Sequence, residues 1–127
     1  MKIKIIASIL SAVWVLMGTT VVSAHHSAAP FNFTSTVQVE GVVKEINIRN
    51  PHSEIILEVT DAERGTRDIE FEGMSASIFY RAGYTIGSVN QEDVIKLIIA
   101  PRHDSSDGGF VMSFITANGG NFGFRRP

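Results

Sequence analysis

The 127-residue sequence contains no cysteine and no apolar run long enough to cross a bilayer. Without cysteine the chain has no disulfide, no thiolate metal ligand and no point at which a lipid could be attached to a processed amino terminus. A chain of this length corresponds to one domain at most. That domain must therefore be held together by its apolar core alone.

The first 24 residues have the pattern of a secretory signal peptide. A short positive start precedes an apolar run over residues 5–17, and small residues at 22–24 supply the positions that signal peptidase reads. The run is shorter than the ~20 apolar residues of a spanning helix, so an uncleaved anchor is the weaker alternative. We expect cleavage after Ala24, a periplasmic or secreted chain that meets the membrane only during export, and His25 as the new amino terminus.

The expected mature chain, residues 25–127, is acidic. It carries 9 Lys and Arg side chains against 13 Asp and Glu, for a formal charge of −4, and it contains no basic run. Nucleic-acid affinity depends largely on the neutralisation of phosphates by basic side chains. The composition therefore argues against a nucleic-acid partner.

Alternating apolar residues predict strands along most of the mature chain. Over residues 36–48 the apolar side switches parity near Lys44-Glu45, and Gly41 lies within the run, as in a long strand that bends at a bulge. The other four strands are predicted over residues 55–59, 69–71, 94–99 and 110–115. Residues 75–82 form the only helical stretch, and Gly83 suits its left-handed end.

This order of elements predicts an all-β protein with one short helix. A long bent first strand, and a helix between the third and fourth strands, are the plan of a small OB-fold-like five-stranded barrel of order β-β-β-α-β-β. A small open sandwich is the structural alternative. We predict a secretory signal peptide over residues 1–24, an N-terminal arm over 25–35, the barrel domain over 36–117 and a loose Gly-rich tail over 118–127.

The histidines all lie outside the predicted strands and helix. They are His25, His26, His52 and His103. The first two are at the expected amino terminus, His52 is in the loop that joins the first two strands, and His103 is in the loop that joins the last two. In an OB-fold these two loops flank the ligand face. Taken singly, each histidine is a solvated polar side chain; taken together, their placement favours a metal site, because imidazole is the commonest protein metal ligand.

A histidine at a free amino terminus offers two metal-binding nitrogens. The amine of His25, with an ordinary pKa of about 7.7–8.0, loses its proton readily when a metal binds, and it can chelate one ion together with its own ring. One imidazole from His52 or His103 would complete three nitrogens in a T, similar to the histidine brace of exported copper proteins. Nitrogen ligands suit copper or zinc, and Cu(II) is favoured over Zn(II) because structural zinc sites usually contain cysteine.

Two other classes of function stay open. A small OB-fold-like binding module for a protein, peptide or saccharide partner would use the histidines only as polar loop residues. An enzyme is the third and least favoured hypothesis, because the chain has no G-x-S-x-G, no phosphate-cradling glycine loop and no cysteine nucleophile. Side chains predicted on solvated strand faces are Glu54, Glu58, Glu70 and Glu72, and those predicted to pack in the core include Met74 and Met112.

Several short motifs occur in a fixed order along the chain. They are Ala24-His25-His26-Ser27, Asn50-Pro51-His52-Ser53, Arg81-Ala82-Gly83-Tyr84, and Pro101 with Asp104 and Gly108-Gly109. Together they resemble an uncharacterised family of small exported bacterial proteins, and the resemblance covers most of the mature chain. It implies a bacterial source and a periplasmic location but no activity. Glu54 replaces an aromatic residue usual in the family, and Ala100 stands where a histidine often precedes the proline, so His103 lies off the family pattern.

Overall fold

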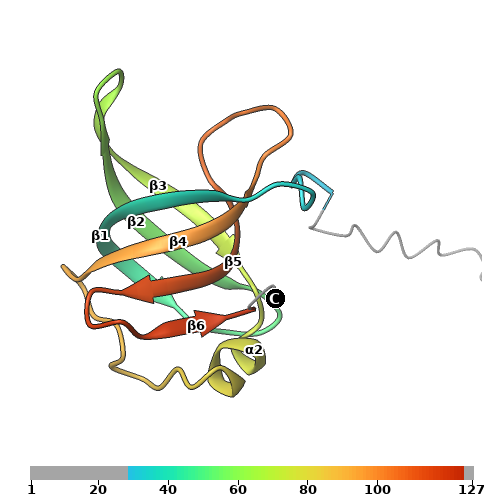
Figure 1. Ribbon diagram of the computed structural model, residues 1–127, viewed down its shortest axis with the longest axis vertical. Coiled ribbons are helices and arrows are strands. Elements are labelled where there is room, and N and C mark those ends of the chain that lie inside the picture. Colours follow the sequence, from blue (N-terminus) through green and yellow to red (C-terminus); the bar gives the residue numbers. More distant parts are fainter. Residues whose placement is uncertain (1–28, 125–127) are drawn as a thin grey trace, which may run out of the picture.

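Strand pairing closes the chain into a barrel, as the computed structural model shows for residues 29–124 (Figure 1). The elements are β1 (Val37–Asn47), β2 (Ser53–Asp61), β3 (Gly65–Gly73), α2 (Ala76–Arg81), β4 (Val94–Pro101), β5 (Gly109–Thr116) and β6 (Asn121–Gly123). The predictions for the signal peptide, its cleavage site, His25 and His26 lie outside the described residues.

The order of the strands across the sheet is β3-β2-β1-β4-β5-β6. All neighbours in this order are antiparallel, and a short parallel pairing of β3 with β5, at Glu72–Phe110 and Gly73–Val111, closes the barrel. Helix α2 packs against β6 at one end, whereas the β2–β3 hairpin and the β4–β5 loop project from the other (Figure 1). The predicted OB-fold-like barrel with one short helix is confirmed. Within residues 29–124 no helix is long and apolar enough to cross a membrane.

The bend in β1 lets one strand belong to both halves of the barrel. Its first part, residues 37–42, pairs with β4, and its second part, residues 42–47, pairs with β2. The register with β2 shifts between Val43 and Glu45, so Lys44 is the extra residue of a bulge. The parity switch in the sequence therefore marks the bend correctly.

Gly41 directly precedes Val42, the first residue of β1 that pairs with β2. A Cβ atom at this position would lie 2.6 Å from the carbonyl oxygen of Glu58 and 3.1 Å from the Cβ of Leu57. A backbone carbonyl within a ladder cannot move aside as the end of a side chain can. The close approach of the two strands therefore requires glycine.

Substitution of Gly41 by alanine is expected to lower the free energy of unfolding by about 1–3 kcal/mol, because the added methyl group overpacks the β1–β2 contact. Urea denaturation measures the change. Gly73→Ala is the matched control, since a Cβ there would meet its nearest neighbours at an ordinary 3.5 Å. Equal stabilities for the two variants would show that the close approach at Gly41 does not constrain the strand.

The main core fills the barrel with apolar side chains from β1 to β5 and from the α2 region. Its buried members are Val43, Ile55, Leu57, Ile69, Phe71, Phe79, Tyr84, Val89, Ile95, Leu97, Ile99, Val111 and Phe114. A second, smaller cluster contains Phe31, Ala100, Phe110 and Met112, with Phe33 and Met74 packed against it. The predicted core positions of Met74 and Met112 are thus confirmed.

A sixth strand lies within the segment predicted to be a loose tail. Residues 121–123 pair with β5, and Phe122 stands opposite Phe114. The Phe122 ring lies 5.4 Å from the Phe114 ring and 5.7 Å from that of Tyr84. The prediction of a loose tail is wrong for β6, because the burial of one aromatic ring against the core outweighs the flexibility of the glycines around it.

Candidate functional site

The segment before β1 is fixed against the β4–β5 loop (residues 102–108). Residues 30–32 run antiparallel to residues 101–103, and the N–H of His103 donates a hydrogen bond of 3.0 Å to the carbonyl oxygen of Pro30. Phe31, in the middle of this short ladder, is 3% exposed. The part of the predicted arm that the structure describes is therefore docked on the barrel, with its first residues beside His103.

One aromatic ring connects this segment to the loop between β1 and β2. The ring centroid of Phe110, at the start of β5, lies 5.5 Å from that of Phe31 and 5.4 Å from that of Phe33. The imidazole of His52 meets the same ring edge-on, at 5.9 Å. The arm, the β4–β5 loop and His52 are thus gathered around Phe110.

His52 forms a close pair with a carboxylate on β3. Its Nδ1 lies 2.5 Å from Oε1 of Glu72, and the two side chains are 38% and 30% exposed. A carboxylate can only accept, so Nδ1 carries the proton and the lone pair of the neutral ring is on Nε2. This pair could not be read from the sequence, because it depends on the register that brings the end of β3 beside the β1–β2 loop.

The glutamates predicted on solvated strand faces are partly exposed, as expected, and most are also paired. Glu54 pairs with Arg49 at 2.8 Å, and Glu58 pairs with Lys44 at 3.5 Å. Glu70 is exposed on β3. The outer face of β2 and β3 is therefore a wet, ion-paired surface.

The structure does not bring His52 and His103 into one metal-binding group. Over residues 29–124 there is no cluster of three or more His, Cys, Asp or Glu side chains placed to hold a metal ion. His103 is exposed on the wall of a cavity, and His52 lies against Phe110 and Glu72. A site of the predicted kind thus depends on His25 and His26, which lie outside the described residues.

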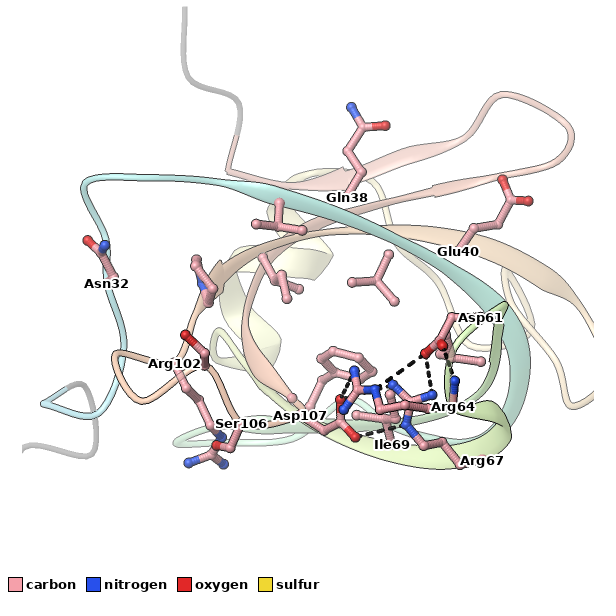
Figure 2. A pocket seen from close by; sticks show the side chains of 18 of the residues that line it. Asn32, Gln38, Glu40, Asp61, Arg64, Arg67, Ile69, Arg102, Ser106 and Asp107 are labelled. Carbon is pink, nitrogen blue, oxygen red and sulfur yellow. Dashed lines mark hydrogen bonds and ion pairs between the residues drawn. The ribbon is translucent and has the colours of Figure 1, made fainter.

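A cavity of about 720 Å³ opens between β1, the β2–β3 hairpin and the β4–β5 loop (Figure 2). Its floor consists of the buried side chains of Ile69, Phe71 and Ile99. Its polar rim includes Asn32, Thr60, Arg102, His103, Ser105 and Ser106. This cavity could not be predicted from the sequence, because it arises where two strands separate.

Four charged residues tie the β2–β3 hairpin to the β4–β5 loop. Arg67 donates two hydrogen bonds to Asp107, of 2.8 and 3.1 Å, and a third of 2.5 Å to Asp61 (Figure 2). Arg64 lies 2.9 Å from Asp107 as well. We call these four residues the ionic clamp; its charges balance, and it holds two walls of the cavity at a fixed separation.

The clamp shifts the ionisation of its own members. Hydrogen bonds from the backbone of Arg64 and from the Arg67 side chain lower the pKa of Asp61 below its ordinary 3.8. The pKa of Asp107 is lowered chiefly by its hydrogen bond to Arg67. Hydrogen bonds to Asp107 and Asp61 raise the pKa of Arg67 in turn. Asp61, Asp107 and Arg67 are therefore charged at neutral pH.

Acid is expected to weaken the wild-type protein more than an Arg67→Gln variant. A carboxylate whose pKa is lowered by folding contributes stability above the unfolded pKa, here 3.8, and that contribution is lost as the pH falls through the folded value. Urea unfolding between about pH 5 and pH 2 measures the difference. Arg81→Gln is the control, since among residues 29–124 the Arg81 side chain bonds a backbone carbonyl, that of Ser77, and no carboxylate. Parallel profiles for wild type and Arg67→Gln would show that the clamp does not contribute to the acid dependence.

Comparison with known proteins identifies one family. The family of unknown function DUF6152 matches residues 13–111. No curated protein matches the chain. The match includes all four histidines and the barrel as far as the start of β5, so the resemblance to an uncharacterised family is confirmed, and it brings no activity with it.

Proposed function

The chain belongs to the DUF6152 family, whose function is unknown, and we propose from its own residues that it is a metal-binding protein. It takes Cu(II) in preference to Zn(II) and holds or hands on the ion without catalysing a reaction. Its ligands are the amine and ring of His25 and the ring of His52, with His26 or His103 as a further ligand. The proposal includes export to the periplasm and removal of residues 1–24, because only a processed chain has the His25 amine.

The docking of residues 30–32 is the observation that carries this proposal. Ala29 is the fourth residue after His25, and an extended chain spans at most ~3.6 Å per residue, so the His25 amine lies within about 15 Å of Ala29. Pro30 is hydrogen-bonded to His103, and the neighbouring Phe31 packs on the ring that also contacts His52. The tether to the terminal histidines thus starts beside His103 and beside the Phe110 ring that His52 contacts, which supports the proposal.

The pair formed by His52 and Glu72 has the form expected around a metal ligand. Metal-binding histidines usually donate their second ring N–H to a carboxylate, which fixes the tautomer and makes the other nitrogen a better ligand. Glu72 accepts from Nδ1 of His52, so Nε2 is the coordinating atom. The residues that the structure describes therefore fit an imidazole ligand at this position.

The choice of Cu(II) follows from the available donors. The chain has no cysteine. Met112 is 6% exposed and packs in the cluster around Phe31 and Phe110, so its thioether is occupied in the core. Soft Cu(I) prefers sulfur ligands, whereas a set of nitrogens binds Cu(II) more tightly than Zn(II).

Two measurements test the proposal in sequence. Mass spectrometry of the protein purified from the periplasm must find His25 as the first residue. Calorimetry with Cu(II) and a competing chelator must then show one ion bound per chain, at least 100-fold more tightly than to the double variant His25→Ala, His52→Ala. A different first residue, or equal Cu(II) affinities for the wild type and the double variant, would rule out the proposed site.

Replacement of Glu72 by glutamine is expected to weaken Cu(II) binding by about tenfold, because loss of the carboxylate lowers the basicity of His52. The fold should be unaffected, since the pair lies at the surface. Competition calorimetry measures the affinity, and Glu70→Gln, two residues away on the same exposed face, is the matched control. If the two variants bind Cu(II) alike, Glu72 has no role in the site.

A second candidate function is favoured by the cavity. Its apolar floor, polar rim and volume of about 720 Å³ are typical of ligand pockets. In this reading the barrel is a binding module for a protein, peptide or saccharide partner, and it needs no metal.

A further inference from the structure

Strands β1 and β2 flank the cavity, and they diverge beyond their last residue pair. Val42 and Glu58 form the last pair between β1 and β2. Residues 37–41 continue along β4 alone, and residues 59–61 continue along β3 alone. The cavity occupies the wedge between these two diverging segments.

One edge of β1 faces this wedge with backbone groups that have no strand partner. The N–H of Val43 donates to Asp93 and its carbonyl accepts from Glu92, both at 2.8 Å, so Val43 points to the β4 side. Backbone groups alternate along an antiparallel ladder, so Gln38 and Glu40 direct their N–H and C=O groups to the opposite edge. Within residues 29–124 no hydrogen bond to these four groups is formed from that side.

Gln38 and Glu40 border the cavity through their backbone. Both residues line it, yet Figure 2 shows both side chains pointing away from it. Their neighbours Val37 and Val39 also line the cavity, and side chains alternate across a strand, so consecutive residues on both faces of β1 contribute to one wall. A wall of this kind is a strand edge.

An open edge beside an apolar floor suits an extended peptide. When a peptide adds as a strand, main-chain hydrogen bonds supply affinity, and alternate side chains enter pockets that supply specificity. Gln38 and Glu40 offer two N–H and two C=O groups to such a strand, and Ile69, Phe71 and Ile99 receive its inward side chains. The ionic clamp keeps the wedge open before a peptide arrives.

The charge on the rim favours an acidic residue in the peptide. The clamp is neutral, and Glu40 pairs with Lys96 at 3.7 Å. Arg102 forms no direct ion pair among residues 29–124, although its charge contributes to the lowered pKa of Asp104, and its guanidinium lies 5.2 Å from the centre of the Phe31 ring. A carboxylate on a bound peptide would meet Arg102 at the β4–β5 loop.

We infer that an extended segment of a partner protein binds in this wedge as an added strand on β1. Its alternate side chains are apolar and face Ile69, Phe71 and Ile99, and it carries a carboxylate that pairs with Arg102. The inference names the partner class for the second candidate function. It uses neither His25 nor the His52 ring, so a failure here leaves the Cu(II) measurements unaffected, and the reverse also holds.

The test is selection of random octapeptides, displayed on phage, against the purified protein, followed by fluorescence polarisation and hydrogen exchange. We expect enrichment of peptides with an apolar residue at every second position and an Asp or Glu, and protection of the Gln38 and Glu40 amides when they bind. Gln38→Pro removes one edge N–H but no bond to β4, and should bind the selected peptides at least tenfold more weakly. Gln38→Ala keeps the N–H and should bind as wild type, and Arg102→Gln should weaken only the acidic peptides.

Controls on the peptide side make the result independent of how the Gln38→Pro variant folds. Two N-methylated forms of each peptide are compared, one methylated at the odd and one at the even peptide bonds. Only one form loses the N–H donors that would pair with β1, so that form should not bind and the other should bind as before. The inference is overturned if no peptide is enriched, if both N-methylated forms bind alike, or if bound peptides leave the Gln38 and Glu40 amides unprotected. Binding of the protein to an oligosaccharide array, with no peptide bound, would also overturn the inference.

Discussion

Acetylation of the free amine of the chain that begins at His25 is expected to weaken Cu(II) binding at least 100-fold, a difference of about 2.7 kcal/mol. The acetyl group turns the His25 amine into an amide, which no longer forms a chelate with the His25 ring at neutral pH. The other histidines are unchanged. Calorimetry with a competing chelator, on both chains at the same pH, measures the two affinities.

The control for this comparison is His26→Ala in the chain that begins at His25. It keeps the terminal chelate and His52, so its affinity should stay within a few-fold of wild type. Equal Cu(II) affinity for the free and the acetylated chain would show that the His25 amine does not create the site. A larger loss for His26→Ala than for acetylation would transfer the main ligand role to His26.

Truncation of Phe114 to alanine is expected to lower the free energy of unfolding by about 3–5 kcal/mol. Phe114 is fully buried, and its ring lies 5.3 Å from that of Phe79 and 5.4 Å from that of Phe122. These contacts join α2 and β6 to the barrel, and a small domain without disulfides has only about 5–15 kcal/mol of total stability. Urea denaturation followed by circular dichroism gives the value.

Phe124→Ala is the matched control for the core. Phe124 follows β6 and is 52% exposed, so its loss should change the free energy of unfolding by about 0.5 kcal/mol or less. If both phenylalanine variants lose the same stability, the aromatic contacts around Phe114 do not hold β6 and α2 in place.

The barrel could be predicted because its key signals are local. The parity switch at Lys44 and Glu45 marks the bulge, and a bulge in a long first strand lets it pair with two neighbours. Gly83, with its φ of +94°, ends the helical region as predicted. Strand β6 was missed because its burial depends on Phe114 and Tyr84, which no local pattern of residues 118–127 reveals.

Only part of the candidate site could be predicted from the sequence. The placement of His52 and His103 in the β1–β2 and β4–β5 loops follows from strand order alone. The docking of Pro30 on His103 and the pairing of His52 with Glu72 do not, because each joins segments far apart in the chain. The same holds for the open edge at Gln38, which exists only because β2 leaves β1 at Glu58.

The docked arm changes the distance over which the terminal histidines act. As a free linker the arm of about ten residues spans up to ~33 Å, whereas the anchored segment leaves four residues, or about 15 Å. A shorter tether raises the effective concentration of the His25 amine near His103, to which Pro30 is hydrogen-bonded. The reach of His25 is therefore counted from Ala29 and not from the start of β1.

The most direct test of the proposed metal site is the electron paramagnetic resonance spectrum of the chain that begins at His25, loaded with one equivalent of Cu(II). We predict hyperfine coupling to at least three nitrogens, with the loss of one on His52→Ala and the loss of the terminal chelate when the His25 amine is acetylated. A spectrum of hydrated Cu(II), or one that is identical for all three chains, would rule out the proposed site.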